Sequence, residues 1–302
     1  SLKTTIMKYI ITGGAGNISK PLALALLEAG KDVTIIGRNA ENLKPLTEKG
    51  AKAAIGSVED VDFLRGTFRG ADAVYTMIPP NHHPADWKAY IGQIGQNFAD
   101  ALRDSGVQFV VNLSSIGAHL PDGCGPVSGL YRAEQALNTL TDIAIRHLRP
   151  GFFYYNFLGN VSMVKQMQII GGNYGNAETK MVLVDTGDIA SVAAEALLEL
   201  NFKGHTIRYI ASDERNAGDV AKAFGQAIGK PELPWVEFTD EQTLQGLQQA
   251  GLAPELAKNY AEMGAAIRTG VMQEDYWKNK PTLGKTKLED FAPVFAQVYQ
   301  SN

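Results

Sequence analysis

A glycine-rich turn near the start of the chain, residues 13–16, combines three glycines with one alanine. It lies between a short apolar run, 9–11, and a segment whose apolar residues have helical spacing, 21–29. At a helix start, glycine leaves the backbone N–H groups open to a phosphate that a Cβ atom would block. The arrangement predicts a pyrophosphate site of the dinucleotide-binding kind, with an ordinary tight turn as the alternative. The residues expected to hold the cofactor here are Gly13, Gly14, Gly16, Asn17 and Ile18.

Ser19 stands where the dinucleotide fingerprint usually has its last glycine. That glycine normally lets the helix and the strand pack closely, and serine is small enough to be tolerated in its place. Its hydroxyl could reach a phosphate or cap the helix. Ser19 therefore leaves the prediction of a dinucleotide site in place.

Arg38 follows a second apolar run, 33–36, where sites that prefer NAD usually have an acidic residue for the ribose hydroxyls. No acidic residue occurs at this point. A guanidinium can bind a 2′-phosphate through paired hydrogen bonds and can stack on adenine, whereas a solvated arginine in a turn is the alternative. We expect NADP(H) to be preferred over NAD(H).

Two serines, Ser114 and Ser115, end another apolar run at 107–113. They could contact the nicotinamide or a substrate, or could only satisfy backbone groups at the end of the strand. Tyr131 lies in a helical segment, 130–140, and could donate a proton to a substrate carbonyl. The alternative for Tyr131 is a tyrosine packed between elements. These three residues are the candidate catalytic groups.

Histidines and aromatic residues supply the remaining candidates. His82 and His83 lie on a loop bounded by prolines, where solvation is the alternative to a role in binding. An aromatic run at 152–157 predicts core packing together with part of an apolar ligand wall. No group of His, Cys and Asp has metal-ligand spacing, so no metal site is predicted. Further expected cofactor contacts are Ile78, Pro79, Ser114, Pro150 and Phe152, and expected substrate contacts are His82, His119, Tyr131, Phe153 and Asn156.

The elements that position these residues alternate between apolar strands and helices. Such alternation is typical of a parallel sheet covered on both faces, the doubly wound α/β fold of Rossmann domains. Ligands bind such sheets outside the carboxyl ends of the strands, so the candidate residues are expected to converge there. The expected strands are 9–11, 33–36, 51–55, 73–78, 107–113, 143–146, 181–184 and 206–210. The expected helices are 21–29, 87–105, 130–140, 187–200, 217–228, 240–250 and 254–268.

Two late segments are expected to play different parts. The helix at 254–268 carries a stripe of Leu256, Tyr260, Met263 and Ile267, which predicts core packing rather than a ligand wall. Residues 270–284 are expected to be irregular and could form a lid over the cleft, around an adjacent tyrosine and tryptophan.

Composition limits the class of protein. The chain has 302 residues, 45% of them hydrophobic and 20% charged, which is ordinary globular composition. The net charge is −4 and no run of Lys or Arg occurs, so nucleic acid is not an expected partner.

The single cysteine, Cys124, favours a reducing compartment, and we expect a cytoplasmic protein. No stretch is long and apolar enough for a membrane span. A small molecule is the expected partner, with a monomer or a homodimer both open.

Several short stretches, in order, resemble motifs of one family. They are 11–16, 37–39, 111–118, 148–156, 185–190, 281–282 and 288–291. The chain is similar to the NmrA-like family, an atypical branch of the short-chain dehydrogenase/reductases. This resemblance implies a dinucleotide-binding domain with a smaller α/β C-terminal domain and a cleft between them. We assign 1–156 with 181–212 to the first domain and 157–180 with 213–302 to the second.

The resemblance also implies two functions, of which we predict the first: an NADPH-dependent oxidoreductase that transfers a hydride to a quinone-like or conjugated carbonyl substrate, with a redox sensor of little or no turnover as the alternative. Relatives include NAD(P)H-dependent quinone reductases, isoflavone-type reductases, and redox sensors that bind the dinucleotide without turnover. The chain departs from the typical Tyr-x-x-x-Lys pair, because Gln135 takes the lysine position and carries no charge to assist Tyr131. Reduction of a quinone-like or conjugated carbonyl fits this loss, since water can protonate the product, and sensing fits it equally. Epimerisation of a sugar nucleotide is disfavoured. At Gly56-Ser57 many relatives have Gly-Asp, which weakens an adenine contact from Ser57.

Overall fold

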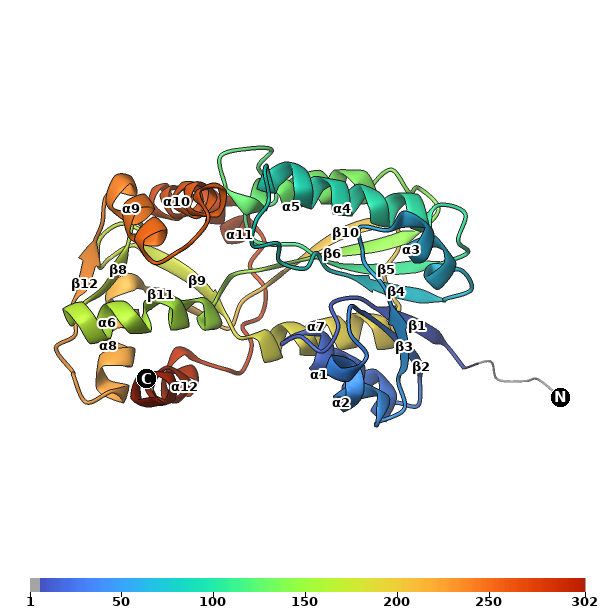
Figure 1. Ribbon diagram of the computed structural model, residues 1–302, viewed down its shortest axis with the longest axis horizontal. Coiled ribbons are helices and arrows are strands. Elements are labelled where there is room, and N and C mark those ends of the chain that lie inside the picture. Colours follow the sequence, from blue (N-terminus) through green and yellow to red (C-terminus); the bar gives the residue numbers. More distant parts are fainter. Residues whose placement is uncertain (1–5, 302) are drawn as a thin grey trace.

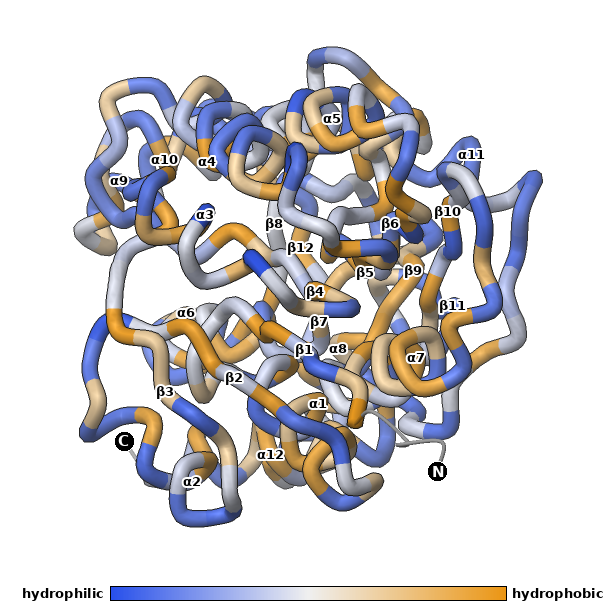
Figure 2. The backbone as a smooth tube through the Cα atoms, turned by 90° about the vertical axis from the view of Figure 1, so that its right-hand side faces the viewer, coloured by the Kyte–Doolittle hydropathy of each residue, from blue (hydrophilic) through white to orange (hydrophobic). Residues whose placement is uncertain are grey.

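The computed structural model describes residues 6–301. It contains a large sheet covered by helices on both faces, joined to a smaller part built from the later elements of the chain (Figure 1). Hydrophobic segments concentrate along the strands, and hydrophilic ones lie mainly in the outer loops (Figure 2). None of the described helices is both long and apolar enough to cross a bilayer.

The large sheet has seven strands, and every neighbouring pair in it is parallel. Its order is β3-β2-β1-β4-β5-β6-β10, so the chain reverses direction across the sheet between β1 and β4. Ligands of doubly wound sheets bind at such a switch point. The strands are β1 (Lys8–Ile11), β2 (Asp32–Gly37), β3 (Lys52–Ile55), β4 (Ala73–Thr76), β5 (Phe109–Leu113), β6 (Ala144–Pro150) and β10 (His205–Ile210).

Helices cover both faces of this sheet because its strands are apolar on both sides. One face packs against α1 (Ser19–Glu28), the short α2 (Lys44–Thr47) and α7 (Thr186–Glu199), and the other against α3 (Val61–Phe68), α4 (Trp87–Leu102) and α5 (Pro126–Leu137) (Figure 1). The predicted fold class, a doubly wound parallel sheet of the Rossmann kind, is confirmed.

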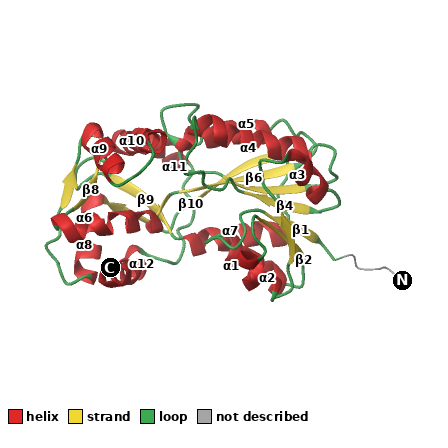
Figure 3. Ribbon diagram, viewed as in Figure 1, coloured by secondary structure: helices red, strands yellow, loops and turns green. Residues whose placement is uncertain are grey.

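The smaller part contains two small sheets and the remaining helices (Figure 3). One sheet orders β11 (Asp213–Asn216), β9 (Lys180–Val184) and β7 (Phe152–Phe153), and the other pairs β12 (Trp235–Glu237) with β8 (Ile170–Gly172). The helical segments are η2 (Tyr154–Asn160), α6 (Val161–Met167), α8 (Ala217–Ala227), α9 (Asp240–Gln249), α10 (Pro254–Thr269), η3 (Val271–Gln273), α11 (Glu274–Lys278) and α12 (Leu288–Ser301), and η1 (Glu41–Leu43) precedes α2 in the larger part.

The chain passes between the two parts more than once. β9 pairs in the three-stranded sheet, whereas α7, which follows it directly, packs against the large sheet. Asp188 in the first turn of α7 is buried and accepts hydrogen bonds from Ser212 Oγ at 2.6 Å and from the Thr286 backbone N–H at 3.1 Å. This carboxylate ties the C-terminal segment to the start of α7. The domain boundaries assigned from the sequence stay a prediction.

All eight strands expected from the sequence are present, with small differences in their ends. The expected helix 87–105 ends at Leu102, because Arg103 is extended and Asp104 has a positive φ of 61°. The strands β7, β8, β11 and β12 were not expected, since they have two to four residues and lack a long apolar run. α3 and α12 were also not expected.

The expectation of an irregular lid at 270–284 is wrong for its first half. Residues 271–278 form η3 and α11, and Tyr276 is completely buried. Its hydroxyl donates to Glu214 Oε1 at 3.0 Å, and its ring packs edge-on against Tyr209 at 5.7 Å between centroids. An aromatic ring held on both sides in this way anchors the segment to the body of the protein.

Candidate active site

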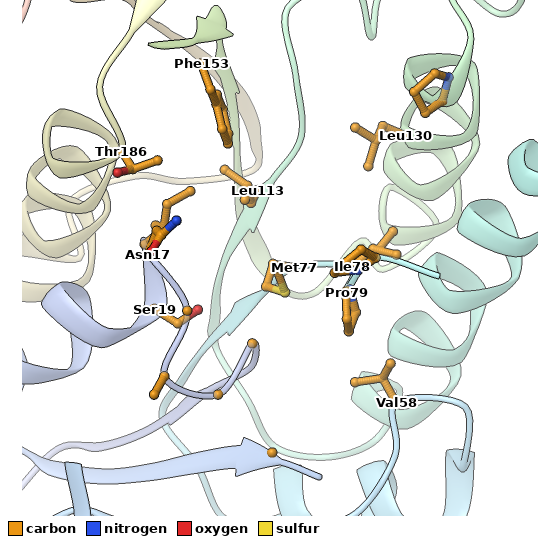
Figure 4. A pocket seen from close by; sticks show the side chains of 18 of the residues that line it. Asn17, Ser19, Val58, Met77, Ile78, Pro79, Leu113, Leu130, Phe153 and Thr186 are labelled. Atoms are coloured by element: carbon orange, nitrogen blue, oxygen red, sulfur yellow. The ribbon is translucent and has the colours of Figure 1, made fainter. Parts of the chain in front are cut away.

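A cleft of about 1240 Å³ runs along the carboxyl ends of the sheet strands, between the large sheet and the smaller part. In Figure 4, Asn17, Thr186 and Phe153 lie on one side of it and Pro79 and Leu130 on the other, with the ends of β4 and β5 between them. The cleft therefore lies where the order of strands reverses, as the fold predicts.

The glycine turn forms one end of the cleft. Gly13 and Gly14 have φ values of +93° and +58°, which L side chains rarely adopt, and a Cβ on Gly13 would collide with Ser19 and Met77. The Gly14 N–H bonds the Ile36 carbonyl at 3.0 Å and so joins the turn to β2. These contacts hold the turn in one conformation.

The turn leaves backbone donors free at the start of α1. Among the described residues, the N–H groups of Ala15, Asn17 and Ile18 have no hydrogen-bond acceptor, and no side chain caps the helix. Free N–H groups and the positive end of the helix dipole together favour an anion. The residues present therefore fit a pyrophosphate.

Ser19 neither caps the helix nor offers its hydrogen to the cleft. Its Oγ donates to the Thr12 carbonyl at 2.8 Å. Thr12 Oγ1 in turn donates to the Tyr75 carbonyl at 3.0 Å and accepts from the Met77 N–H at 2.8 Å. These bonds lock the ends of β1 and β4 together and set Met77 and Ile78 in the cleft wall.

Arg38 lines the cleft at the same end as the glycine turn, together with Ser57 and Glu59. Arg38 is exposed, and it has no hydrogen-bond or ion-pair partner within residues 6–301. Its neighbour Asn39 accepts a hydrogen bond from the Glu41 N–H at 2.8 Å, which shapes the loop after β2. The guanidinium is thus free to bind an anionic group.

The end of β5 places two serines in the cleft. Ser114, only 5% exposed, donates from Oγ to Glu134 Oε2 at 2.5 Å. Ser115 donates from Oγ to the Ile116 carbonyl at 2.8 Å. Both hydroxyl hydrogens are therefore engaged inside the protein.

Glu134 belongs to a buried ion pair behind the cleft. Arg149 donates to it twice, from Nη2 to Oε1 at 2.8 Å and from Nε to Oε2 at 3.1 Å. Burial acts to lower the pKa of Arg149, but the hydrogen bond and charge of Glu134 outweigh it and raise the pKa. Arg149 Nη1 also donates to the Tyr209 hydroxyl at 3.1 Å, which donates to Asp275 on α11 at 2.5 Å. The pair thus connects the end of β5 with α11.

The other end of the cleft is aromatic and uncharged. Trp87 and Tyr260 meet there edge to face with 5.3 Å between ring centroids. Within the described lining, the charged side chains are Arg38, Glu41 and Glu59, all at the opposite end. The further side chains at the aromatic end are Leu130, Phe152, Phe153, Tyr155, Asn156, Met263 and Met272. Such a wall suits a flat apolar ligand.

Two glutamates on α10 position this wall through three hydrogen bonds. Glu262 Oε1 accepts from Lys88 Nζ at 2.7 Å and from the Gly125 N–H at 2.8 Å. Glu255 Oε1 accepts from the Trp87 N–H, the first residue of α4, at 3.1 Å. α10 is therefore fastened to the start of α4 and to the loop before α5.

Most of the predicted site residues line the cleft. These are Gly13, Gly14, Gly16, Asn17, Ile18, Arg38, Ile78, Pro79, Ser114, Ser115, Phe152, Phe153 and Asn156. That they touch cofactor or substrate stays a prediction.

Four predicted residues lie outside the cleft lining. Tyr131 follows Leu130 on α5, and since consecutive helix positions differ by about 100°, it turns away when Leu130 faces the cleft. His119 contacts Glu274 on α11 at 3.2 Å, and Pro150 is buried in β6. His82 is exposed on its loop.

Several lining residues were missed by sequence reasoning. The stripe on α10 divides, because Leu256 and Ile267 are core whereas Tyr260 and Met263 reach the cleft. Helical spacing shows which residues share a face but not which partner that face meets. For Glu134 the sequence contains one signal that could have been used: it is a charged residue on an otherwise apolar face of its helix.

Across the described residues, no group of three or more His, Cys, Asp or Glu side chains could hold a metal ion.

The parallel sheet has a glycine turn at its switch point, and the helix that follows the turn has no side-chain cap. Together these features define the Rossmann class of dinucleotide-binding proteins. The sequence model of the NmrA-like family matches residues 5–270, and the chain belongs to this family.

Known proteins similar to the chain cover nearly its whole length. It is 25% identical over 256 residues to the NAD(P)H azoreductase of Xenophilus azovorans, covering 85% of this chain and 86% of the azoreductase. Its fold matches an NADPH-dependent quinone oxidoreductase of Escherichia coli with a TM-score of 0.77 at 19% identity, covering 94% and 98% of the two chains. It also matches the triphenylmethane reductase of Citrobacter sp. complexed with NADP(H), with a TM-score of 0.78 at 20% identity, covering 95% and 99%.

Proposed function

We propose that the chain is an NADPH-dependent oxidoreductase that reduces a flat, conjugated carbonyl compound such as a quinone. One observation carries this proposal: a single cleft joins free N–H donors at the start of α1 to an uncharged aromatic wall. A dinucleotide and a flat acceptor would lie end to end in such a cleft, which is the arrangement that hydride transfer requires. The azoreductase and the quinone oxidoreductase, named for NAD(P)H and NADPH, support it.

The residues divide between the two ligands. The N–H groups of Ala15, Asn17 and Ile18 would hold the pyrophosphate, and Arg38 the 2′-phosphate that distinguishes NADP from NAD. When bound, NADPH supplies a hydride, and the protein supplies position and a dry environment. Trp87 and Tyr260 would stack against the acceptor and exclude water from it.

The protonation that completes the reduction favours a quinone. Tyr131 lies outside the cleft lining, and Ser114 and Ser115 direct their hydrogens into the protein. A quinone that accepts a hydride becomes a hydroquinone monoanion, a phenolate, and water can give it the one proton that completes the hydroquinone. An alkyl ketone would need a protein donor for its alkoxide.

The same observation favours a second candidate, a redox sensor that binds NADP(H) with little turnover. A protein that reads the cofactor needs the pyrophosphate site and Arg38 but needs no proton donor. The aromatic end of the cleft would then hold a regulatory ligand or a segment of a partner protein.

The experiment that separates the candidates mixes the purified protein with NADPH and a series of quinones of increasing ring size. We expect steady loss of reduced-nicotinamide absorbance with the quinones and a much slower rate with simple alkyl ketones. Tight binding of NADPH without its consumption by any quinone would instead support the sensor. A mixture lacking protein controls for direct reduction of the quinones.

A further inference from the structure

The hydroxyl hydrogen of Ser114 is used in a hydrogen bond inside the protein and is not available to a ligand in the cleft. Ser114 lines the cleft and is 5% exposed, and its Oγ donates to Glu134 Oε2 at 2.5 Å. A serine hydroxyl has one hydrogen and two lone pairs, so a hydroxyl that has given its hydrogen can only accept. What Ser114 offers a ligand is therefore a lone pair.

The surroundings of Glu134 keep it the acceptor in this hydrogen bond. It is almost fully buried, at 1% exposed, and both its oxygens receive N–H groups of the Arg149 guanidinium. A guanidinium has only donors, so both Glu134 oxygens act as acceptors in this ion pair. A carboxylate has no hydrogen to give, so Ser114 is the donor in the Ser114–Glu134 hydrogen bond.

We propose that Ser114 accepts a hydrogen bond from the carboxamide N–H₂ of the nicotinamide, and that Glu134 is the positioning residue that restricts Ser114 to this role. The inference rests on the proposed binding of NADP(H). The nicotinamide carboxamide carries a donor side and an acceptor side, and a partner that only accepts selects the donor side. Ser114 would thereby fix which way the carboxamide, and with it the ring, faces in the cleft.

The location of Ser114 favours the cofactor over the substrate as its partner. It follows directly on β5, the neighbour of β4 at the switch point, and it is 5% exposed where it lines the cleft. The aromatic side chains proposed to hold a substrate come from other elements, Trp87 on α4 and Tyr260 on α10. A ligand lying along the strand ends from the glycine turn reaches Ser114 first.

The test compares binding of NADPH with binding of its reduced 3-acetylpyridine analogue, in which a methyl group replaces the amide N–H₂. Binding is followed by nucleotide fluorescence with no substrate present, so no turnover is needed. One hydrogen bond predicts that wild-type protein binds NADPH about fivefold more tightly than the analogue. In Ser114→Ala this preference should fall to about one, with circular dichroism showing an unchanged fold.

Further variants separate positioning from simple structural support. Ser115→Ala is the matched control and should keep the preference, because its hydroxyl is tied to the Ile116 carbonyl. Ser114→Thr, which keeps a hydroxyl, should show the same preference for NADPH over the analogue as the wild-type protein. In Glu134→Ala the Ser114 hydrogen is released, so the preference should fall, whereas a merely structural Glu134 would weaken both nucleotides equally.

The outcomes are distinguishable from failure of the proposed function. Loss of the preference in Ser115→Ala, or its retention in Ser114→Ala, would overturn the assignment to Ser114. Equal wild-type affinity for the two nucleotides would overturn it as well. If Glu134→Ala does not fold, the comparison of the two serine variants still decides the role of Ser114. If the wild-type protein binds neither nucleotide, the proposed function itself fails.

Discussion

Arg38 is the single cationic side chain in the cleft lining that the structure describes, and it stands at the end where a dinucleotide would place its adenosine. The two acidic side chains in the lining, Glu41 and Glu59, lie at the same end, and Glu41 is already paired with Lys44 at 2.8 Å. An arginine without an ion-pair partner can form charge-assisted hydrogen bonds with a 2′-phosphate. At the level of single residues, the proposed preference for NADP(H) therefore depends on Arg38.

The first prediction concerns this choice. Arg38→Asp should weaken NADPH binding by roughly 10- to 100-fold, because a charge-assisted hydrogen bond is lost and a repulsive charge is added. NADH, which has no 2′-phosphate, should change far less. Fluorescence titration of both nucleotides measures the effect. The matched control is Arg69→Asp, an exposed arginine outside the cleft lining. Equal losses for NADPH and NADH would refute the assignment of the 2′-phosphate to Arg38.

At the level of elements, α10 shapes the aromatic end of the cleft, where the substrate is proposed to bind. It brings Tyr260 and Met263 to the cleft, and Glu262 fastens it to Lys88 and to the Gly125 N–H. A Cβ on Gly125, which has a positive φ of 58°, would collide with the Asn259 carbonyl of α10. The helix and the loop before α5 therefore pack at backbone distance.

The second prediction follows from this packing. Glu262→Ala should raise the KM for a quinone by about tenfold, because the loss of a charged acceptor loosens the wall that carries Tyr260. The dissociation constant for NADPH should stay nearly constant, since the glycine turn and Arg38 lie on other elements. Steady-state kinetics and fluorescence titration give the two values. Glu241→Ala, an exposed change on α9, serves as the control. A parallel loss of NADPH affinity would mean that α10 does not act on the substrate end alone.

At the level of the whole molecule, a buried polar chain crosses the middle of the large sheet. Thr76 Oγ1 donates to Asn112 Oδ1 at 2.8 Å, Asn112 Nδ2 donates to His147 Nδ1 at 3.1 Å, and His147 Nε2 donates to Asn138 Oδ1 at 2.8 Å. This order assigns one neutral tautomer to His147, protonated on Nε2. Since the chain spans β4, β5 and β6, its loss affects the sheet on which both ligand sites are built.

The third prediction is the pH dependence that this histidine causes. The pKa of His147 is lowered from 6.5 to about 4, mainly by burial. The charge of Glu134 opposes this shift, and the charges of Arg149 and His205 add to it. A lowered pKa means that folding favours the neutral form. The stability that His147 contributes is therefore complete above pH 6.5 and is lost as the pH falls from 6.5 to 4.

Unfolding in urea at pH 7 and pH 4.5 measures this contribution. The wild-type free energy of unfolding should fall by about 2–3 kcal/mol more than that of His147→Gln, in which the side chain cannot titrate. The His83→Gln variant, at an exposed loop position, controls for the removal of a histidine elsewhere in the protein. Equal pH dependence of wild-type protein and His147→Gln would show that His147 is not held neutral.

Some features followed from the sequence alone because they depend on local physics. The glycine turn, the apolar runs of the strands and the missing acidic residue after β2 are each visible within a few residues, and they sufficed to predict the Rossmann fold and the family. Backbone conformation and short-range periodicity encode such features directly.

Other features were decided only by tertiary structure, because they depend on which faces meet. The sequence does not reveal that Tyr260 faces the cleft while Tyr131 turns away from it, since both have helical surroundings. Nor does it pair Glu134 with Ser114 and Arg149, which are 20 and 15 positions away. Burial brings these groups together, and a buried charge is tolerated only with such partners. The turn that would hold the cofactor is thus local, whereas the wall that would hold the substrate exists only in the folded chain.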